Sequence, residues 1–68
     1  MDRSALTERE RSVVRLVARG WTNRQIAAEL DLSIATVKRN LANIMIKWDC
    51  ANRTEVAIRV VQREARVS

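Results

Sequence analysis

The chain has 68 residues, 47% of them hydrophobic, and its 13 lysines and arginines outnumber 8 aspartates and glutamates, giving a net charge of +5. This length predicts one small domain, residues 1–68, that hides only about 60% of its unfolded surface, while the charge favours a polyanionic partner, nucleic acid before a membrane surface. One cysteine (Cys50) and no histidine exclude an internal disulfide, a Cys/His zinc site and a Ser-His or Cys-His catalytic pair.

The first predicted helix covers residues 8–19 and begins with a capping box. The Thr7 hydroxyl and the Glu10 carboxylate stand three residues apart, so each can accept a hydrogen bond from a backbone amide near the other. Gly20 follows the helix and suits a C-terminal cap with a positive φ angle.

Three further helices follow, each with a recognisable start. Thr22 and Gln25 form a second capping box and predict a helix at 23–30, and Ser33 can cap a third helix at 34–48. Asn52, followed three residues later by Glu55, begins a fourth helix at 53–66. Because proline is absent and polar and apolar residues hardly alternate, strands are not expected, and the fold class is all-α.

The second and third helices are joined by a short connection, which predicts a helix-turn-helix. Only residues 31–33 separate the two helices, and the small side chain of Ala27 allows them to approach closely. Asp31 lies in the connection, where an aspartate tolerates a left-handed backbone better than most residues do. The inner face of the third helix is apolar and recurs at helical spacing, at Val37, Leu41, Ile44 and Trp48.

The outer face of the third helix follows from this inner stripe. If Val37 is set at zero and each residue adds about 100°, the opposite side, at roughly 100–240°, is small, cationic and amide-bearing. It carries Ala35, Lys38, Arg39, Ala42 and Asn43. Such a surface fits the major groove of DNA, where lysine and arginine donate to guanine and asparagine pairs with adenine. The alternative interpretation of Lys38 and Arg39 is a solvated helix face.

The fourth helix is apolar over roughly 200°, about twice the width of a one-sided stripe. One face can pack on the core, which leaves a second face for dimerisation, at Ala57, Ile58, Val61 and Ala65. We expect a two-fold homodimer that presents two third helices to an inverted repeat, with half-sites about one helical turn apart. The alternative is that these side chains are scattered and exposed on a monomer.

Four stretches combine into one pattern: LTERE at 6–10, RLVARGWTNRQIAAELDLS at 15–33, TVKRNLANI at 36–44 and NRTEVA at 52–57. In this pattern the sequence resembles the LuxR-type (FixJ or GerE-type) DNA-binding domain of bacterial transcription regulators. The resemblance implies that the third helix enters the major groove and that Lys38, Arg39 and Ala42 lie at positions that contact bases or backbone. It also implies an upstream sensing or receiver domain in many members, and pairing through the last helix.

The resemblance further suggests phosphate contacts at Thr22, Asn23, Arg24 and Thr36, with Lys47 as an additional basic candidate. Thr22 and Asn23 have an equally good structural explanation as helix-capping residues. The sequence departs from the family pattern at Asn40, where histidine is common, at Trp48, where leucine is common, and at Asp49-Cys50, which replaces a turn of small residues. Ala42 is also short where some members carry a long polar side chain, so the target sequence is left open.

The function predicted from these features is sequence-specific binding of double-stranded DNA for the regulation of transcription. The alternatives are a sigma-factor-like promoter-reading module and a helical protein-interaction module that does not bind DNA. RNA polymerase is a further candidate partner. We expect no enzymatic activity and no cofactor, because the sequence shows no glycine-rich phosphate loop or paired-carboxylate cleft. Without a signal peptide or apolar span, we expect a cytoplasmic protein, with Cys50 as a buried or half-buried filler.

Overall fold

The computed structural model describes residues 5–67, with side chains described as far as residue 65. Over this range the chain forms four α-helices and no strand: α1 (Glu8–Ala18), α2 (Asn23–Leu30), α3 (Ile34–Trp48) and α4 (Arg53–Val67). The all-α prediction is confirmed, and only the ends of the first and last helices differ from expectation, by one residue each. Residues 1–4 and 68 of the expected domain lie outside the described residues.

The predicted capping boxes form at the starts of α1 and α2. The Thr7 hydroxyl accepts a hydrogen bond from the Glu10 amide at 3.1 Å, and the Glu10 carboxylate accepts one from the Thr7 amide at 2.9 Å. At α2, the Thr22 hydroxyl accepts from the Gln25 amide at 3.1 Å, and the Gln25 side chain accepts from the Thr22 amide at 2.8 Å. Each box satisfies two backbone amides that have no partner inside the helix.

The starts of α3 and α4 are also capped by the expected residues. The Ser33 hydroxyl accepts a hydrogen bond from the Thr36 amide at 3.0 Å. The Asn52 side chain accepts one from the Glu55 amide at 2.9 Å, while the Glu55 carboxylate accepts one from the Ala51 amide at 2.7 Å. Local hydrogen bonding therefore determines where each helix begins.

Left-handed backbone conformations follow the ends of the first three helices. Gly20 has a φ angle of 85°, as its position after α1 predicts. Asp31 caps α2 with a φ angle of 56°, and Asp49 caps α3 with a φ angle of 54°. The amides that follow these two aspartates bond back into the preceding helices, from Leu32 to Ala27 at 2.8 Å and from Cys50 to Met45 at 2.9 Å. Each helix thus ends in a tight turn that redirects the chain.

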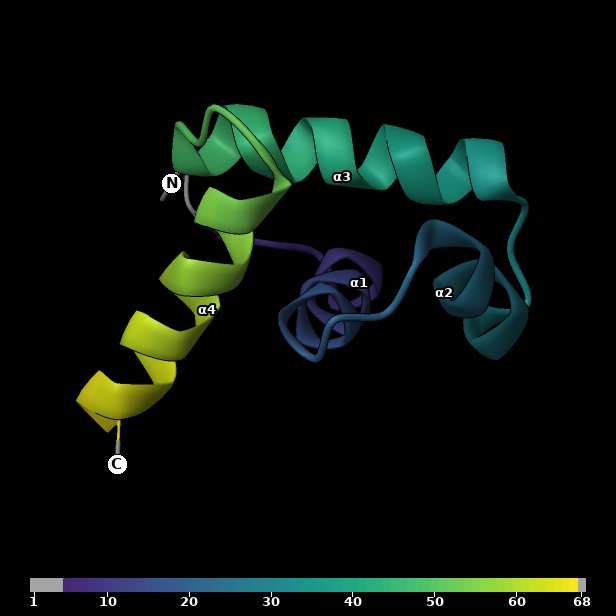
Figure 1. The fold of residues 1–68 in the computed structure, drawn as a ribbon. Coiled ribbons are helices and arrows are strands. Elements are labelled where there is room, and N and C mark those ends of the chain that lie inside the picture. The colour runs from purple at the N-terminus through teal and green to yellow at the C-terminus, as the bar shows by residue number, and fades with distance from the viewer. Residues whose placement is uncertain (1–4, 68) are drawn as a thin grey trace.

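The other three helices surround α1 on three sides. In Figure 1, α1 is viewed along its axis, α3 lies above it, α2 lies to the right beneath one end of α3, and α4 descends on the left. The short connection of residues 31–33 joins α2 to α3 at the right edge of the view. No helix in the described range is long and apolar enough to cross a membrane.

The core contains residues from every helix. Its largest fully buried side chains are Val13, Ile26, Val37, Ile44 and Val56. All four residues of the predicted inner stripe of α3 are buried, including Leu41 and Trp48. Because one side of α3 is held in this core, its rotation about its own axis is determined, and so is the set of side chains it presents to solvent.

Candidate nucleic-acid interface

The outer face of α3 is open to solvent over its central turns. Lys38, Arg39, Ala42 and Asn43 are exposed, and so is Ala35 one turn before them. The side chains of Lys38 and Arg39 form no hydrogen bond or ion pair with any residue that the structure describes. The four predicted base-contacting residues therefore lie together on one accessible surface, and their contacts with DNA stay a prediction.

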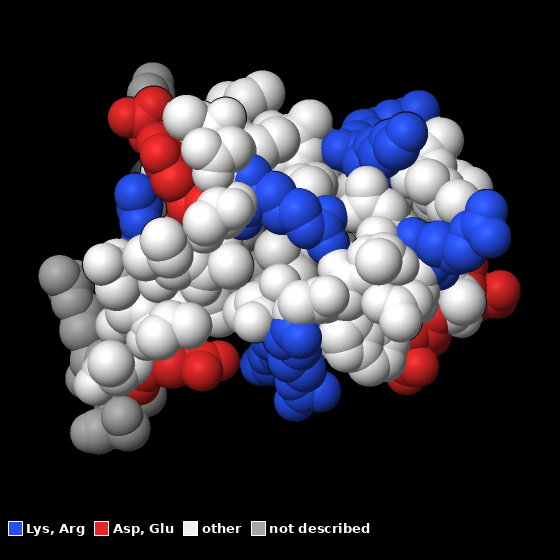
Figure 2. Space-filling view, in the orientation of Figure 1, with Lys and Arg blue, Asp and Glu red and all other residues white. Residues whose placement is uncertain are grey.

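Charge is distributed unevenly along α3. Figure 2 shows lysine and arginine side chains over the N-terminal half of α3 and over α2, with one group of acidic side chains near the junction of α3 and α4 and others at the edge of the α2 side. The N-terminal half of α3 carries the exposed Lys38 and Arg39, and α2 carries the exposed Arg24, whereas the exposed acids lie at the end of α2 and around the turn between α3 and α4: Glu29, Asp31, Asp49 and Glu55. The outer face of α3 offers a polyanion the two exposed cations Lys38 and Arg39 in its N-terminal half, without an acidic residue on that helix half.

The N-terminal turn of α2 lies beside this cationic region and contains three predicted phosphate contacts. Arg24 is exposed and makes no side-chain interaction within the described part of the chain. Thr22 is exposed, but its hydroxyl already caps the helix, and Asn23 is half-buried. Since the first amides of a helix carry partial positive charge, this turn provides a favourable environment for a phosphate even where the side chains are engaged.

Arg53, at the start of α4, holds the N-terminal end of α2 in place. Its guanidinium donates one hydrogen bond to the Asn23 side chain at 2.5 Å and a second to the backbone carbonyl of Trp21. The Asn23 side chain therefore has a partner within the protein, which supports a structural role for this residue rather than that of a free phosphate ligand. Arg53 was not singled out from the sequence, because the contact joins residues 30 positions apart and leaves no local signal.

Thr36 takes part in the cap at the start of α3. Its hydroxyl lies 2.9 Å from the Ser33 hydroxyl, and its own amide donates to the same Ser33 oxygen. The side chain is half-buried. A hydroxyl pair of this kind retains capacity to donate to or accept from an external group, because each hydroxyl has one donor and two acceptor positions.

Lys47, predicted as a basic phosphate contact, is bound within the protein. Its ammonium lies 2.6 Å from a carboxylate oxygen of Glu10, across the interface between α3 and α1. The Glu10 side chain is 5% exposed and that of Lys47 is 33% exposed. The ion pair reduces the positive charge that Lys47 can offer to an external anion, so Lys47 is better placed to fix α3 on α1 than to bind a phosphate.

The environment of Glu10 keeps its carboxylate charged. Burial on its own raises the pKa of Glu10, but the hydrogen bonds donated by Lys47 and Thr7 and the charge of Lys47 outweigh that effect, and the pKa lies below its ordinary value of 4.5. Glu10 therefore completes the capping box of α1 and the ion pair to α3 with the same ionised side chain.

The C-terminal end of α3 is held by two arginines of α4. Arg59 donates a hydrogen bond to the Trp48 carbonyl at 3.1 Å, and the Arg63 guanidinium lies 4.6 Å from the centre of the Trp48 ring. A cation at this end of a helix also opposes the partial negative charge of the last carbonyls. Cys50 is half-buried nearby, its thiol 3.7 Å from the same carbonyl, in agreement with its predicted filling role.

The predicted dimerisation face of α4 is largely exposed. The side chains of Ile58 and Val61 are 51% and 58% exposed, and Ala65 is also on the surface. Ala57 differs, because it is partly buried and packs against the core. A second apolar side chain, Ile46, is 78% exposed near the C-terminal end of α3, on the same side as Ala42.

Comparison with known proteins agrees with this architecture. Residues 4–60 match the family described as bacterial regulatory proteins of the luxR family. The chain belongs to this family. The resemblance stated from the four sequence stretches is therefore confirmed, and the helix-turn-helix formed by α2 and α3 is consistent with it.

Curated relatives show the same relationship over most of the chain. The chain is 46% identical over 54 residues to the monoamine regulon transcriptional regulator of Klebsiella aerogenes, and 43% identical over 54 residues to the transcriptional regulatory protein LiaR of Bacillus subtilis. It is 39% identical over 57 residues to the response regulator protein VraR of Staphylococcus aureus. These matches cover 79%, 79% and 84% of this chain but only 24%, 26% and 27% of the relatives, so the chain spans about a quarter of their length.

Proposed function

We propose that residues 1–68 act as one domain that binds double-stranded DNA sequence-specifically and thereby regulates transcription, with α3 in the major groove. The observation that carries the proposal is the contrast between the two sides of α3. One side is buried in the core, whereas the other presents Lys38 and Arg39 without internal partners among the described residues. The names of the relatives, all regulators, support the same function.

In this arrangement Lys38, Arg39, Ala42 and Asn43 face the base edges. A helix with its side chains is about 10–12 Å across and the major groove is about 12 Å wide, so α3 fits the groove with its small outer residues toward the floor. Arg24 and the amides at the start of α2 hold a phosphate, with Thr22 and Thr36 as further polar contacts. Asn23 and Lys47 contribute by positioning α2 and α3.

We further propose a homodimer that binds an inverted repeat through the exposed face of α4. The support is the pair of large apolar side chains, Ile58 and Val61, which no other residue of the described chain covers fully. A two-fold pair places two α3 helices in successive major grooves, about 34–36 Å apart. The replacement Val61→Lys is expected to abolish pairing on DNA while leaving the fold intact, as judged by light scattering and helical content.

Selection of bound duplexes from a random pool tests the proposed function directly. We expect a motif with two-fold symmetry and an affinity that falls with salt, since each neutralised phosphate contributes about −0.9 to the slope of log K against log salt concentration. Lys38→Ala and Arg39→Ala should each weaken binding to the selected duplex by about 1–3 kcal/mol, whereas Arg24→Ala should weaken all duplexes equally. Absence of any salt-dependent binding contradicts the proposal.

An alternative from another functional class is a protein-interaction module, which the exposed Ile46 and the apolar face of α4 favour. That function gives no reason for the cations over the N-terminal half of α3. Absence of salt-dependent binding to any duplex, in the unaltered chain as in Lys38→Ala and Arg39→Ala, supports the alternative. A cytoplasmic location and contact with RNA polymerase are consistent with the proposed role in transcription and belong to the same proposal.

A further inference from the structure

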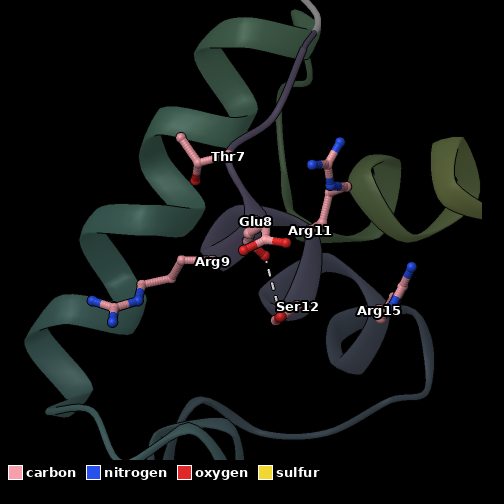
Figure 3. Close-up of a pocket in the computed structure, with 6 residues that line it drawn as sticks. All are labelled: Thr7, Glu8, Arg9, Arg11, Ser12 and Arg15. Atoms are coloured by element: carbon pink, nitrogen blue, oxygen red, sulfur yellow. Dashed lines mark hydrogen bonds between the residues drawn. The ribbon is translucent and has the colours of Figure 1, made fainter.

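Arginines on α1 point to different sides of the helix. Arg9, Arg11 and Arg15 are all exposed and line one shallow surface depression together with Thr7, Glu8 and Ser12. Figure 3 shows Arg9 extending toward α3, whereas Arg11 and Arg15 lie on the side that faces α4. Because the three side chains point in different directions, they do not converge on one ligand. Arg9 lies in a different environment from Arg11 and Arg15.

The part of α1 that contains Arg9 is held against α3. Glu10, the next residue, binds Lys47 of α3 at 2.6 Å, and α1 packs along α3. In Figure 3 the Arg9 side chain extends toward the N-terminal half of α3. Arg9 forms no hydrogen bond or ion pair with any residue of the described range, unlike Lys47, whose charge is opposed by Glu10. Arg9 is therefore an uncommitted cation of α1 beside the proposed recognition helix.

The dimensions of the groove place DNA backbone within reach of this side chain. When α3 occupies the major groove, its side chains fill the width, and the two phosphate strands run along its flanks. A helix packed on α3 has its axis about 8–10 Å away, so a long side chain on its near side lies next to one strand. Arginine is well suited to this contact because its planar guanidinium can donate two hydrogen bonds to one phosphate.

We propose that Arg9 binds a phosphate of the DNA strand that flanks the N-terminal half of α3. This site depends on the DNA-bound arrangement proposed above and adds α1 to the surface that contacts the duplex, next to α2 and α3. Since the contact is to backbone, Arg9 contributes to affinity for every sequence and fixes the depth of α3 in the groove, without selecting bases.

The matched variants Arg9→Met, Arg11→Met and Arg15→Met test the site, because each removes one positive charge from the same helix. The full chain is titrated by fluorescence anisotropy on a selected duplex and on a random duplex, from about 50 to 200 mM salt. For Arg9→Met we expect the slope of log K against log salt to become shallower by about 0.9, so that affinity falls about three- to four-fold less over this range than in the unaltered chain. Arg11→Met and Arg15→Met should keep the original slope, and Arg9→Lys should keep most of it.

Equal slopes for the Arg9 and Arg11 variants overturn the assignment, because a general loss of positive charge then accounts for both. An affinity loss restricted to the selected duplex also overturns it, since that result indicates base contact. If Lys38→Ala weakens specific binding while Arg9→Met leaves the slope unchanged, the proposed function stands and only the Arg9 site is wrong. If the unaltered chain binds no duplex, the proposed function itself is wrong. Thermal unfolding of each variant identifies any change that acts through the fold.

Discussion

The ion pair between Glu10 and Lys47 gives the most direct test of how α3 is held. The two residues are 37 positions apart in sequence, and their charged groups are 2.6 Å apart. The replacement Glu10→Gln retains an oxygen that can accept the Thr7 amide, as Glu10 does at 2.9 Å, but removes the charge opposite Lys47. The change therefore isolates the ion pair from the helix cap.

The expected loss follows from the burial of the two side chains. A hydrogen bond to a charged group contributes about 1.5–3 kcal/mol, and loss of one partner of a fully buried pair costs about 3–5 kcal/mol. Because Lys47 is 33% exposed and can turn toward water, we expect the lower range, about 1.5–3 kcal/mol. A domain of this length has a free energy of unfolding of about 3–10 kcal/mol, so the melting temperature should fall by about 6–24 °C.

The effect should depend on pH in a defined direction. The pKa of Glu10 in the folded state lies below its ordinary value of 4.5, so the ion pair stabilises the fold fully above that pH. As the pH falls through the lower folded-state value, Glu10 gains a proton and the contribution disappears. Stability of the unaltered chain should therefore fall in acid more steeply than that of Glu10→Gln.

A double-mutant cycle with Glu10→Gln and Lys47→Met measures the interaction by urea unfolding at pH 7 and at a series of lower pH values. We expect a coupling energy of about 1.5–3 kcal/mol at pH 7 that fades in acid. A coupling below about 0.5 kcal/mol at pH 7, or one that persists unchanged in acid, refutes the view that this pair fixes α3 on α1.

Three further predictions concern stability. Ile44→Val removes one methylene from a fully buried site and should lower the free energy of unfolding by about 0.5–1.5 kcal/mol. In urea titrations the dependence of that free energy on urea concentration should stay the same. An unchanged free energy of unfolding would argue against the observed packing of α3. Asp31 has a left-handed backbone, so Asp31→Gly should be more stable than Asp31→Ala by about 1 kcal/mol in thermal melts, and equal stability contradicts that conformation. Arg63→Ala removes the cation from the Trp48 ring and should lower the free energy of unfolding by about 0.5–1 kcal/mol, whereas Arg63→Lys, which keeps the charge, should lower it less. Equal losses of stability in both variants would indicate that the planar guanidinium, and not its charge, makes the contact.

Much of the fold could be predicted from the sequence, because its signals are local. A capping side chain and the backbone amide three positions later lie within one helical turn, so Thr7, Thr22, Ser33 and Asn52 predict all four helix starts. At every start but that of Ser33, a glutamate or glutamine three positions later adds to the signal. The recurrence of apolar residues along α3 was equally local, and it gave the correct buried face and the correct exposed face. Asp31 was recognised as a residue that tolerates the left-handed turn it adopts.

The contacts between helices could not be predicted in the same way. Lys47 reads as a free basic residue in the last turn of α3, but its partner Glu10 is far away in sequence, where the sequence predicts only a capping box. The apolar pattern of α4 predicts Ala57 on the exposed face, whereas the structure places it partly against the core. Arg9 has no distinctive sequence spacing, and its position beside α3 depends on how α1 crosses that helix.

The two sides of α3 use separate residues, and this separation affects how the domain can change over evolutionary time. Substitutions at Lys38, Arg39 or Ala42 alter the groups offered to a ligand without touching Val37, Leu41 or Ile44, which hold the helix in place. Surface replacements of this kind usually change stability by less than about 0.5 kcal/mol. New binding preferences can therefore arise by single substitutions on an unchanged scaffold. Paralogous domains of this kind can differ in what they bind while they keep the same fold.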